Sequence, residues 1–524
     1  MLVKRLLFLK IKMEVCVALL ALTVLSASVA LAQGRVKVER FEFEGNTQVS
    51  SEKLGLVLAD LRDHELTFEE LKAAADRLTD LYRKEGYFTV RATVPAQDVK
   101  DGVVKFNIIE SKLGKVSIQG NERYSSEFIN WYLEPVTKDE YPDRHLLQRQ
   151  LLLLNEFPEL EVSSIVEAGE DPNSVDLVFD VVDDHPTHFS IDYNNFGSRF
   201  TGRDRIGATL DFGNLSGNGD RLVLRGLRSL ASKGVTLGTL SYSVPVSNSG
   251  TKASLMLSNA AYGVGRELEI LDIRGEAFVA GAFVTHPLVR TPDWNLDLTG
   301  GFLWQNIDDL ILDQTISRDR LREVVVGVAT DWSGHGGRNY FNARMTQDLG
   351  GALGGMSSND PLSSRQAGGG FNKWNLDLAR VQSFSSKWFG IARISHQFAN
   401  RPLPTAEQYA LGGIDTVRGY SQAAYLGDAG YNVSGEIRWQ PIEGEDKDLL
   451  QLVGFIDHGS AYLKRPALGE IGNISLTGAG FGVRLNLPQE TTIRADIGWA
   501  LSDNALTDQV GKGPVTYLTF GKTF

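Results

Sequence analysis

Apolar and polar residues alternate with a period of two over long stretches of the C-terminal part of the chain. In residues 492–500 every second side chain is apolar, and the side chains between them are polar or small. The apolar positions are Ile493, Ala495, Ile497 and Trp499, and those between include Arg494, Asp496 and Gly498. Residues 481–487 repeat the pattern. A period of two predicts β-strands with one apolar face. Both a membrane barrel and a soluble β-sandwich contain such strands, so alternation alone leaves both folds open.

Residues 35–184 follow a different pattern, because helical periodicity appears between the strand signals. Residues 36–43 predict an apolar strand that ends at Gly45-Asn46. Thr67 and Glu70 have the spacing of a capping box at a helix start. Apolar residues then recur at helical spacing until a glycine, and strands are predicted over 87–95 and 103–110. The predicted order is strand, helix, helix, strand, strand.

The same order repeats 75 residues later, where Gly120-Asn121 follows a second short apolar strand. Helices are predicted over 125–133 and 143–157, and strands over 161–168 and 175–182. We therefore predict two tandem α/β modules, over 35–114 and 115–184. The open edges of their small sheets could bind an extended peptide by β-augmentation, although both modules could also serve as spacers.

Residues 1–32 have the pattern of a secretory signal peptide. Basic residues open the segment, an apolar run follows, and Ala30-Leu31-Ala32 supplies the cleavage pattern. A membrane anchor is the alternative, and Met13 is an alternative start. Cys16, the single cysteine, lies in this segment, so the exported chain would have no disulfide or thiol chemistry. Cleavage would also change the net charge from −12 to −15, by removing four basic residues and one acidic residue.

Composition also separates the two parts of the chain. The acidic balance argues against a nucleic-acid-binding protein, which needs a basic surface. Of 54 glycines, only 8 precede residue 187, and Trp131 is the one tryptophan before that point. Glycine and tryptophan are therefore concentrated in residues 187–524.

The C-terminus favours the barrel over the sandwich. Leu518, Phe520 and the terminal Phe524 share one face of the last predicted strand, and an aromatic last residue is common in outer-membrane barrels. Strands of 9–11 residues with their turns take about 20 residues each. Residues 187–524 then accommodate about 16 strands, enough for a water-filled or plugged lumen.

The sequence contains no recognisable catalytic motif. No G-x-S-x-G, H-E-x-x-H, P-loop or EF-hand pattern is present. His185 and His188 are the only close histidine pair, and a metal site there is an alternative that no further ligand motif supports. We therefore predict no catalytic residue, metal ligand or cofactor. A barrel enzyme that assembles its site from distant strands stays possible.

One segment joins glycines to a lone arginine, and a later strand carries an isolated acid. Residues 411–420 contain Gly412-Gly413 and end in Val417-Arg418-Gly419-Tyr420. In residues 455–459, Phe455, Asp457 and Gly459 share one face of a predicted strand, so Asp457 would point into the lumen. An arginine lowered into the lumen could pair with this carboxylate bidentately. Alternatively, both are ordinary lumen or loop charges.

These motifs resemble a known superfamily. Val417-Arg418-Gly419-Tyr420 matches the VRGY signature of the POTRA–β-barrel proteins, and Phe455, Asp457 and Gly459 match their F-x-D-x-G strand motif. The resemblance is strongest to TpsB transporters of two-partner secretion, the hemolysin-activator type. Further matching blocks, in the family's order, lie at 87–102, 194–202, 242–245 and 408–413.

The resemblance implies a 16-stranded barrel in the outer membrane of a Gram-negative bacterium, preceded by two POTRA domains in the periplasm. Such a transporter binds an unfolded exoprotein through its POTRA domains and secretes it through the pore without ATP. In the family the VRGY loop folds into the lumen, which implies that Arg418 pairs with Asp457. Implied partners are the exoprotein, outer-membrane lipid or lipopolysaccharide, and the barrel assembly machinery, but no nucleic acid. We expect a monomer.

Other functions remain open on this fold. An insertase of the same superfamily and a passive porin are the alternatives, besides the barrel enzyme. Many TpsB proteins also carry an N-terminal helix that plugs the pore, but cleavage after Ala32 would leave only about two residues before the first strand. We therefore expect that helix to be absent and the loop alone to close the pore.

Overall fold

The computed structural model describes residues 35–503 and 513–524. The predicted signal peptide, 1–32, lies outside the described residues. The chain packs as two units. The first comprises the described residues up to Gln119 with Pro135–Leu147 and Ser164–Phe179, and the second comprises Gly120–Glu134, Gln148–Ser163 and the chain from Asp180.

The N-terminal segment forms a three-stranded sheet packed on helices. The order is β2-β5-β4, in which β2 is parallel and β4 antiparallel to β5. The elements are β1 Val36–Lys37, β2 Arg40–Glu44, α2 Ser51–Val57, η1 Ala59–Leu61, β3 Glu65–Leu66, α3 Phe68–Lys84, β4 Arg91–Thr93 and β5 Val103–Ile109. Strands β1 and β3 form a separate antiparallel pair.

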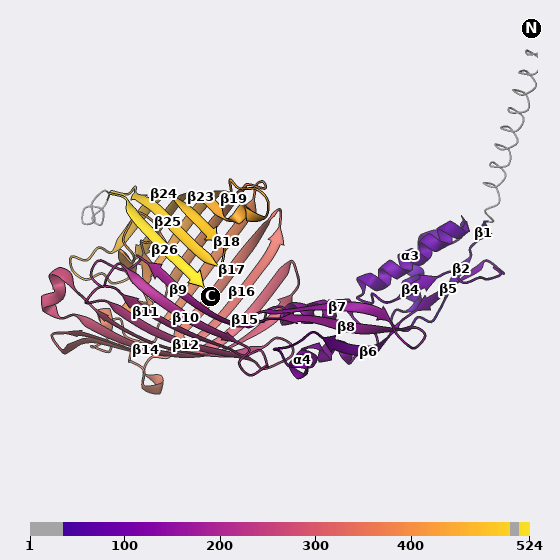
Figure 1. Cartoon of the computed structure of the whole chain (residues 1–524), viewed down its shortest axis with the longest axis horizontal. Coiled ribbons are helices and arrows are strands. Elements are labelled where there is room, and N and C mark those ends of the chain that lie inside the picture. The colour runs from indigo at the N-terminus through magenta and orange to yellow at the C-terminus, as the bar shows by residue number, and fades with distance from the viewer. Residues whose placement is uncertain (1–34, 504–512) are drawn as a thin grey trace, which may run out of the picture. The chain divides into compact units, whose positions relative to one another are not determined.

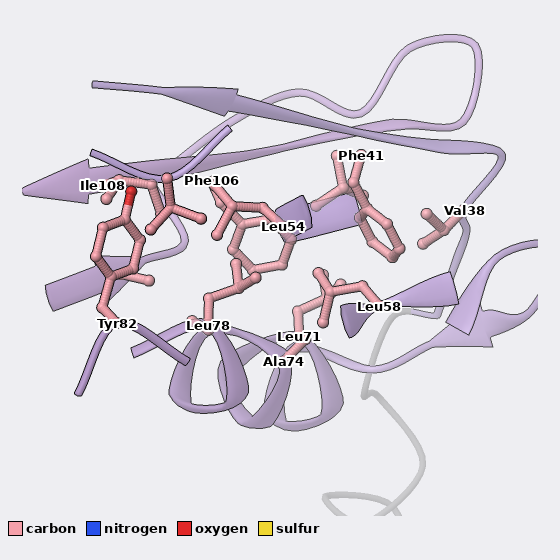
Figure 2. Close-up of a cluster of buried hydrophobic side chains, with 14 of the residues drawn as sticks. Val38, Phe41, Leu54, Leu58, Leu71, Ala74, Leu78, Tyr82, Phe106 and Ile108 are labelled. Atoms are coloured by element: carbon pink, nitrogen blue, oxygen red, sulfur yellow. The ribbon is translucent and has the colours of Figure 1, made fainter. Parts of the chain in front are cut away.

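Helix α3 begins as the sequence predicts. The Thr67 hydroxyl accepts from the Glu70 amide at 3.2 Å, and the Glu70 carboxylate accepts from the Thr67 amide at 2.7 Å, which completes the capping box. Figure 2 shows the apolar face of α3 against the sheet, with Leu78 below Phe106. The hydrophobic effect of burying this face holds the helix on the sheet.

The strand predicted over 87–95 is shorter than expected. Only Arg91–Thr93 pairs with β5, while Tyr87 forms a single bridge with Asp143. Gly86 has φ +104°, which turns the chain after α3 and directs Tyr87 to that other partner.

The two predicted repeats share the same turn, which contacts a carboxylate in the same way in each. Gly45 and Gly120 both have φ +88°, and the turn after each glycine points successive backbone N–H groups at a carboxylate. Glu110 accepts from the amides of Thr47 and Gln48 at 2.9 and 3.0 Å. Asp183, in the second repeat, accepts from the amides of Glu122, Arg123 and Tyr124.

We predict that the Glu110 carboxylate stabilises the first repeat in a pH-dependent way. Burial alone would raise its pKa, but the bonds from Thr47, Gln48 and Tyr82 outweigh burial and lower it below its usual value. A lowered folded-state pKa means that the stabilisation is complete above the unfolded pKa, about 4.3, and is lost as the pH falls through the folded value. Glu110→Ala should cost about 2 kcal/mol or more at pH 7.

Hydrogen exchange at the Thr47 and Gln48 amides of the full chain measures this loss. The matched control is Asp80→Asn, which removes an exposed ion pair with Arg83 and should change protection little. Equal protection in Glu110→Ala and wild type would contradict the prediction.

The second repeat contains β6 Lys112–Gln119, α4 Ser126–Thr137, α5 Arg144–Leu154, β7 Leu160–Ala168 and β8 Ser174–Asp183. Its sheet order is β6-β8-β7. Element types and order agree with the sequence prediction, and boundaries differ by a few residues, because helix ends depend on caps outside the apolar periodicity.

The C-terminal strands close into a sixteen-stranded antiparallel barrel, as predicted (Figure 1). Closure excludes the β-sandwich. The strands are β9 Thr187–Asn194, β10 Arg205–Gly213, β11 Arg221–Ser229, β12 Val235–Pro245, β13 Lys252–Gly263, β14 Arg274–Arg290, β15 Trp294–Ile311, β16 Gln314–Gly334, β17 Gly337–Asp348, β18 Asn372–Ser383, β19 Trp388–Ala399, β22 Ala429–Trp439, β23 Leu450–Tyr462, β24 Asn473–Leu487, β25 Thr491–Ala500 and β26 Val515–Thr523.

The period-two alternation sorts side chains to the two faces of the wall. On β25, Trp499 is exposed on the outside while Asp496 is fully buried inside. Phe481 of β24 is likewise exposed. The predicted apolar faces therefore point outward. No helix in the described part of the chain is both long and apolar enough to cross a membrane.

Several strands exceed the predicted 9–11 residues. Strands β14, β15 and β16 have 17, 18 and 21 residues. An apolar band about 25 Å tall needs fewer, so these strands extend past it. The ends of β15 and β16 carry Asp308, Arg318 and Arg320, and the two arginines pair with Asp308.

The barrel closes between β26 and β9, where five residue pairs are in register, from Thr519↔Asn194 to Thr523↔Ser190. Phe524 follows β26 and exchanges two backbone hydrogen bonds with Phe189, while their rings stack at 5.9 Å. Leu518 and Phe520 are exposed apolar side chains on β26. The last residue thus extends the closing seam.

Candidate functional site: a loop inside the barrel

The chain between β19 and β22, residues 400–428, folds against the inner wall. Its strands β20 Tyr409–Leu411 and β21 Tyr425–Gly427 pair with each other. The Tyr409 hydroxyl donates to Asn432 of β22 at 2.6 Å. On β23, Ile456 is 58% exposed outside while its neighbour Asp457 is 1% exposed, so Asp457 faces the lumen. The loop therefore occupies the lumen beside β22 and β23.

The structure brings Arg418 and Asp457 together. The Nε and Nη2 atoms of Arg418 donate to the two carboxylate oxygens of Asp457 at 2.7 and 2.8 Å, and the Arg418 backbone amide donates at 3.1 Å. Ser434 donates to the same carboxylate at 2.6 Å. This bidentate geometry fixes both the position and the orientation of the loop tip.

A second carboxylate completes the pocket around the arginine. Arg418 Nη1 donates to Glu436 Oε1 at 2.7 Å, and Arg438 donates to the other oxygen of Glu436 at 2.8 Å. The guanidinium carbon lies 3.5 Å from the ring centroid of Phe455, a cation–π contact. Arg418 is 2% exposed and Glu436 4% exposed. Removing one member of such a buried group costs about 3–5 kcal/mol, because a charge is left without its partner.

Each residue of the predicted strand motif has a distinct contact. Phe455 supplies the ring, Asp457 the carboxylate, and Gly459 leaves room for the loop. A Cβ at Gly459 would lie 2.7 Å from the Leu411 side chain. A larger residue there would force the Leu411 side chain or the wall backbone at Tyr431 to shift.

Two wall glycines, which the sequence did not single out, receive the loop tip. A Cβ on Gly478 of β24 would overlap the carbonyl oxygen of Arg418, and one on Gly498 of β25 would lie 2.7 Å from the Gly419 amide nitrogen. The backbone of the tip thus approaches the wall as closely as glycine allows.

The tip is also bonded to the last strand. Gly419 donates its amide to the Tyr517 hydroxyl at 3.0 Å, and that hydroxyl donates to the Tyr420 carbonyl. The Tyr420 hydroxyl donates to the Thr477 carbonyl at 3.0 Å. Val417 is fully buried in an apolar cluster with Leu411 and Leu476. All four residues of the predicted loop motif therefore contact the wall.

Sequence reasoning missed five wall partners: Ser434, Glu436, Gly478, Gly498 and Tyr517. They lie on four strands, and no local motif marks them. The alternation along each strand could have placed these residues on the inward face, because most of their neighbours in the chain are apolar and point outward. The alternation shows on which face a residue lies, but it does not show which loop residue it contacts.

The site consists of hydrogen bonds, ion pairs and apolar contacts between the loop and the wall. Within residues 35–503 and 513–524, no group of three or more His, Cys, Asp or Glu side chains is placed to hold a metal ion. His188, one residue of the close histidine pair noted in the sequence, has its Nε2 atom 3.2 Å from a carboxylate oxygen of Glu159. What the arrangement can do is hold the loop tip against the inner wall through buried, charge-assisted hydrogen bonds.

Comparisons with known proteins identify the family of the chain. A family model described as haemolysin secretion/activation protein ShlB/FhaC/HecB matches residues 173–485, and a model described as POTRA domain, ShlB-type, matches residues 36–111. The chain is 24% identical over 470 residues to the heme/hemopexin transporter protein HuxB of Haemophilus influenzae, covering 88% of this chain and 82% of that protein.

Solved structures share the fold. CdiB from Escherichia coli has a TM-score of 0.78 at 19% identity, covering 94% of this chain and 92% of that one. BamA from Haemophilus ducreyi lacking POTRA domains 1-3 has a TM-score of 0.55 at 13% identity, covering 94% and 100%. The family match favours secretion over the insertase alternative. The chain belongs to the haemolysin secretion/activation family, ShlB/FhaC/HecB, whose members secrete exoproteins through the outer membrane.

Proposed function

We propose that the chain captures its unfolded exoprotein on the periplasmic modules and passes it through the lumen when the loop at Arg418 is displaced. The buried contact of Arg418 with Asp457 and Glu436 carries this proposal, because it holds a loop tip inside the closed barrel. Folding of the exoprotein outside would draw it through without ATP.

The sheet edges of the modules support the capture step. In the first sheet, β2 and β4 are the outer strands, and in the second, β6 and β7. An unpaired edge offers backbone donors and acceptors to any extended chain, with little demand on its side chains. An unfolded exoprotein is such a chain.

The remaining partners follow from the outer surface. Exposed apolar residues on the outward faces, among them Leu255, Ile437 and Ile456, would contact lipid, including lipopolysaccharide in the outer leaflet. We further propose that the assembly machinery inserts the barrel, and that the transporter acts as a monomer without covalent chemistry.

Export of a defined exoprotein tests the proposal. The full chain would be expressed with a large exported protein as the candidate exoprotein, in a strain that lacks both. Surface exposure of the exoprotein would be measured by protease accessibility. The exoprotein should reach the surface only when the chain is present, while the levels of other outer-membrane proteins stay unchanged. A general loss of outer-membrane proteins without the chain would instead favour the insertase.

A further inference from the structure

A second cluster of buried polar groups holds the inserted loop, in a different sector of the wall from Arg418. Glu407 lies in the short 3-10 turn Thr405–Glu407, near the start of the loop. Its Oε1 atom accepts from Gln305 of β15 at 3.0 Å, and its other oxygen pairs with Lys373 of β18. Its backbone carbonyl accepts from Gln397 of β19 at 2.9 Å. Three strands thus hold this end of the loop.

The same cluster contains a buried carboxylate, Glu323, of which only one oxygen accepts a hydrogen bond. Glu323 of β16 is 1% exposed, and its Oε2 atom accepts from the same Gln305 nitrogen at 2.9 Å. Its Oε1 atom is buried and accepts no hydrogen bond. Because one amide nitrogen bridges them, the bonded oxygens of Glu323 and Glu407 lie within about 6 Å of each other, a distance at which two ionised carboxylates would repel appreciably.

The residues of the cluster belong to two parts of the fold, the loop and the barrel wall. Glu407 belongs to the loop and would leave with it. Gln305, Glu323 and Lys373 belong to the wall and would stay. Lys373 pairs with Glu407, and Glu407 shares the Gln305 amide nitrogen with Glu323, so the lysine lies near both carboxylates. Loop withdrawal therefore removes one of two carboxylates that compete for a single lysine and a single amide.

We propose that Glu407, Lys373 and Gln305 are positioning residues that anchor the base of the loop, and that Glu323 takes over Lys373 when the loop leaves. This inference rests on the proposed displacement of the loop. The transfer leaves neither charge alone in the lumen, so it lowers the cost of opening. At the loop tip, Glu436 keeps Arg438 in the same way, whereas Asp457 loses Arg418.

Channel recordings of the purified full chain in planar bilayers test the inference, because the open fraction reports loop withdrawal directly. Glu407→Gln weakens the anchor but leaves the acceptor, so the open fraction should rise about fivefold or more. Glu323→Gln removes the acceptor and the repulsion, so the open fraction should fall by a similar factor. A merely structural role would shift both variants in the same direction.

A double variant provides a second measurement. Lys373→Glu with Glu407→Lys restores the anchor with reversed charges, but withdrawal then leaves two carboxylates at positions 323 and 373. Its open fraction should lie below that of the wild type, and an equal value would overturn the transfer. The matched control is Glu443→Gln, which removes an exposed pair with Lys387 and should change nothing.

The recordings also separate this inference from the function on which it rests. If Arg418→Ala raises the open fraction while the variants at Glu323 and Glu407 match the wild type, loop displacement stands and the transfer is wrong. If Arg418→Ala changes neither the open fraction nor export, the proposed function itself fails.

Discussion

Replacing Arg418 by alanine is expected to reduce secretion of the exoprotein about tenfold or more while the barrel still assembles. The substitution removes the contacts that the Arg418 side chain makes with Asp457 and Glu436, and it leaves Asp457 buried without that cation. The loss of about 3–5 kcal/mol falls on the loop, because the sixteen strands keep their own backbone ladder. The loop tip should therefore lose its fixed position, and with it the coordinated opening that export needs.

The measurement is surface-exposed exoprotein per assembled transporter, with assembly followed by heat-dependent mobility in gels. Asp457→Ala should give the same phenotype, because it removes the other member of the pair. Gly478→Val is an independent comparison, since it displaces the Arg418 backbone sterically and leaves both charges in place. Normal export by both Arg418→Ala and Asp457→Ala would show that the pair has no role in transport.

Deleting residues 35–110 is expected to abolish capture of the exoprotein in a pull-down. The deletion removes the sheet β2-β5-β4 with its two outer strands and the helix that supports it. An exoprotein that pairs with the edges of both sheets loses the contacts of the first sheet, and the edges β6 and β7 that remain should not hold it through a pull-down.

The control for this deletion is the pore itself. The barrel closes through β9 and β26, both outside the deleted segment, so the shortened chain should still assemble and conduct. Undiminished capture by an assembled deletion variant would place recognition elsewhere, in the second repeat or the lumen.

Much of the architecture could be predicted because its signals are local. The Thr67–Glu70 capping box, the repeated Gly-Asn turns and the period-two strands all depend on residues that are neighbours in the chain. Strand number followed from the length of the glycine-rich part divided by the length of one strand and its turn. Strand length was underestimated for β14, β15 and β16, since nothing in the alternation shows where the membrane ends.

The loop site could likewise be predicted only as far as its signals are local in the sequence. By itself, the sequence determined the two motifs, around Arg418 and Asp457, and the face on which Asp457 lies. Only the tertiary structure decided that Glu436, Gly478 and Tyr517 meet the same loop tip. Their contacts join residues 18 to 98 positions apart, and closure of the barrel brings those positions together.

The cluster around Glu407 at the base of the loop could not be predicted, because it too depends on tertiary packing. Glu407, Gln305 and Glu323 carry no motif, and each is an ordinary polar residue in the sequence. Their importance comes from burial and from shared partners, and both depend on how the wall curves around the loop. Local periodicity determines which side of a strand a residue occupies, but the packed fold alone decides which charges must share one lysine.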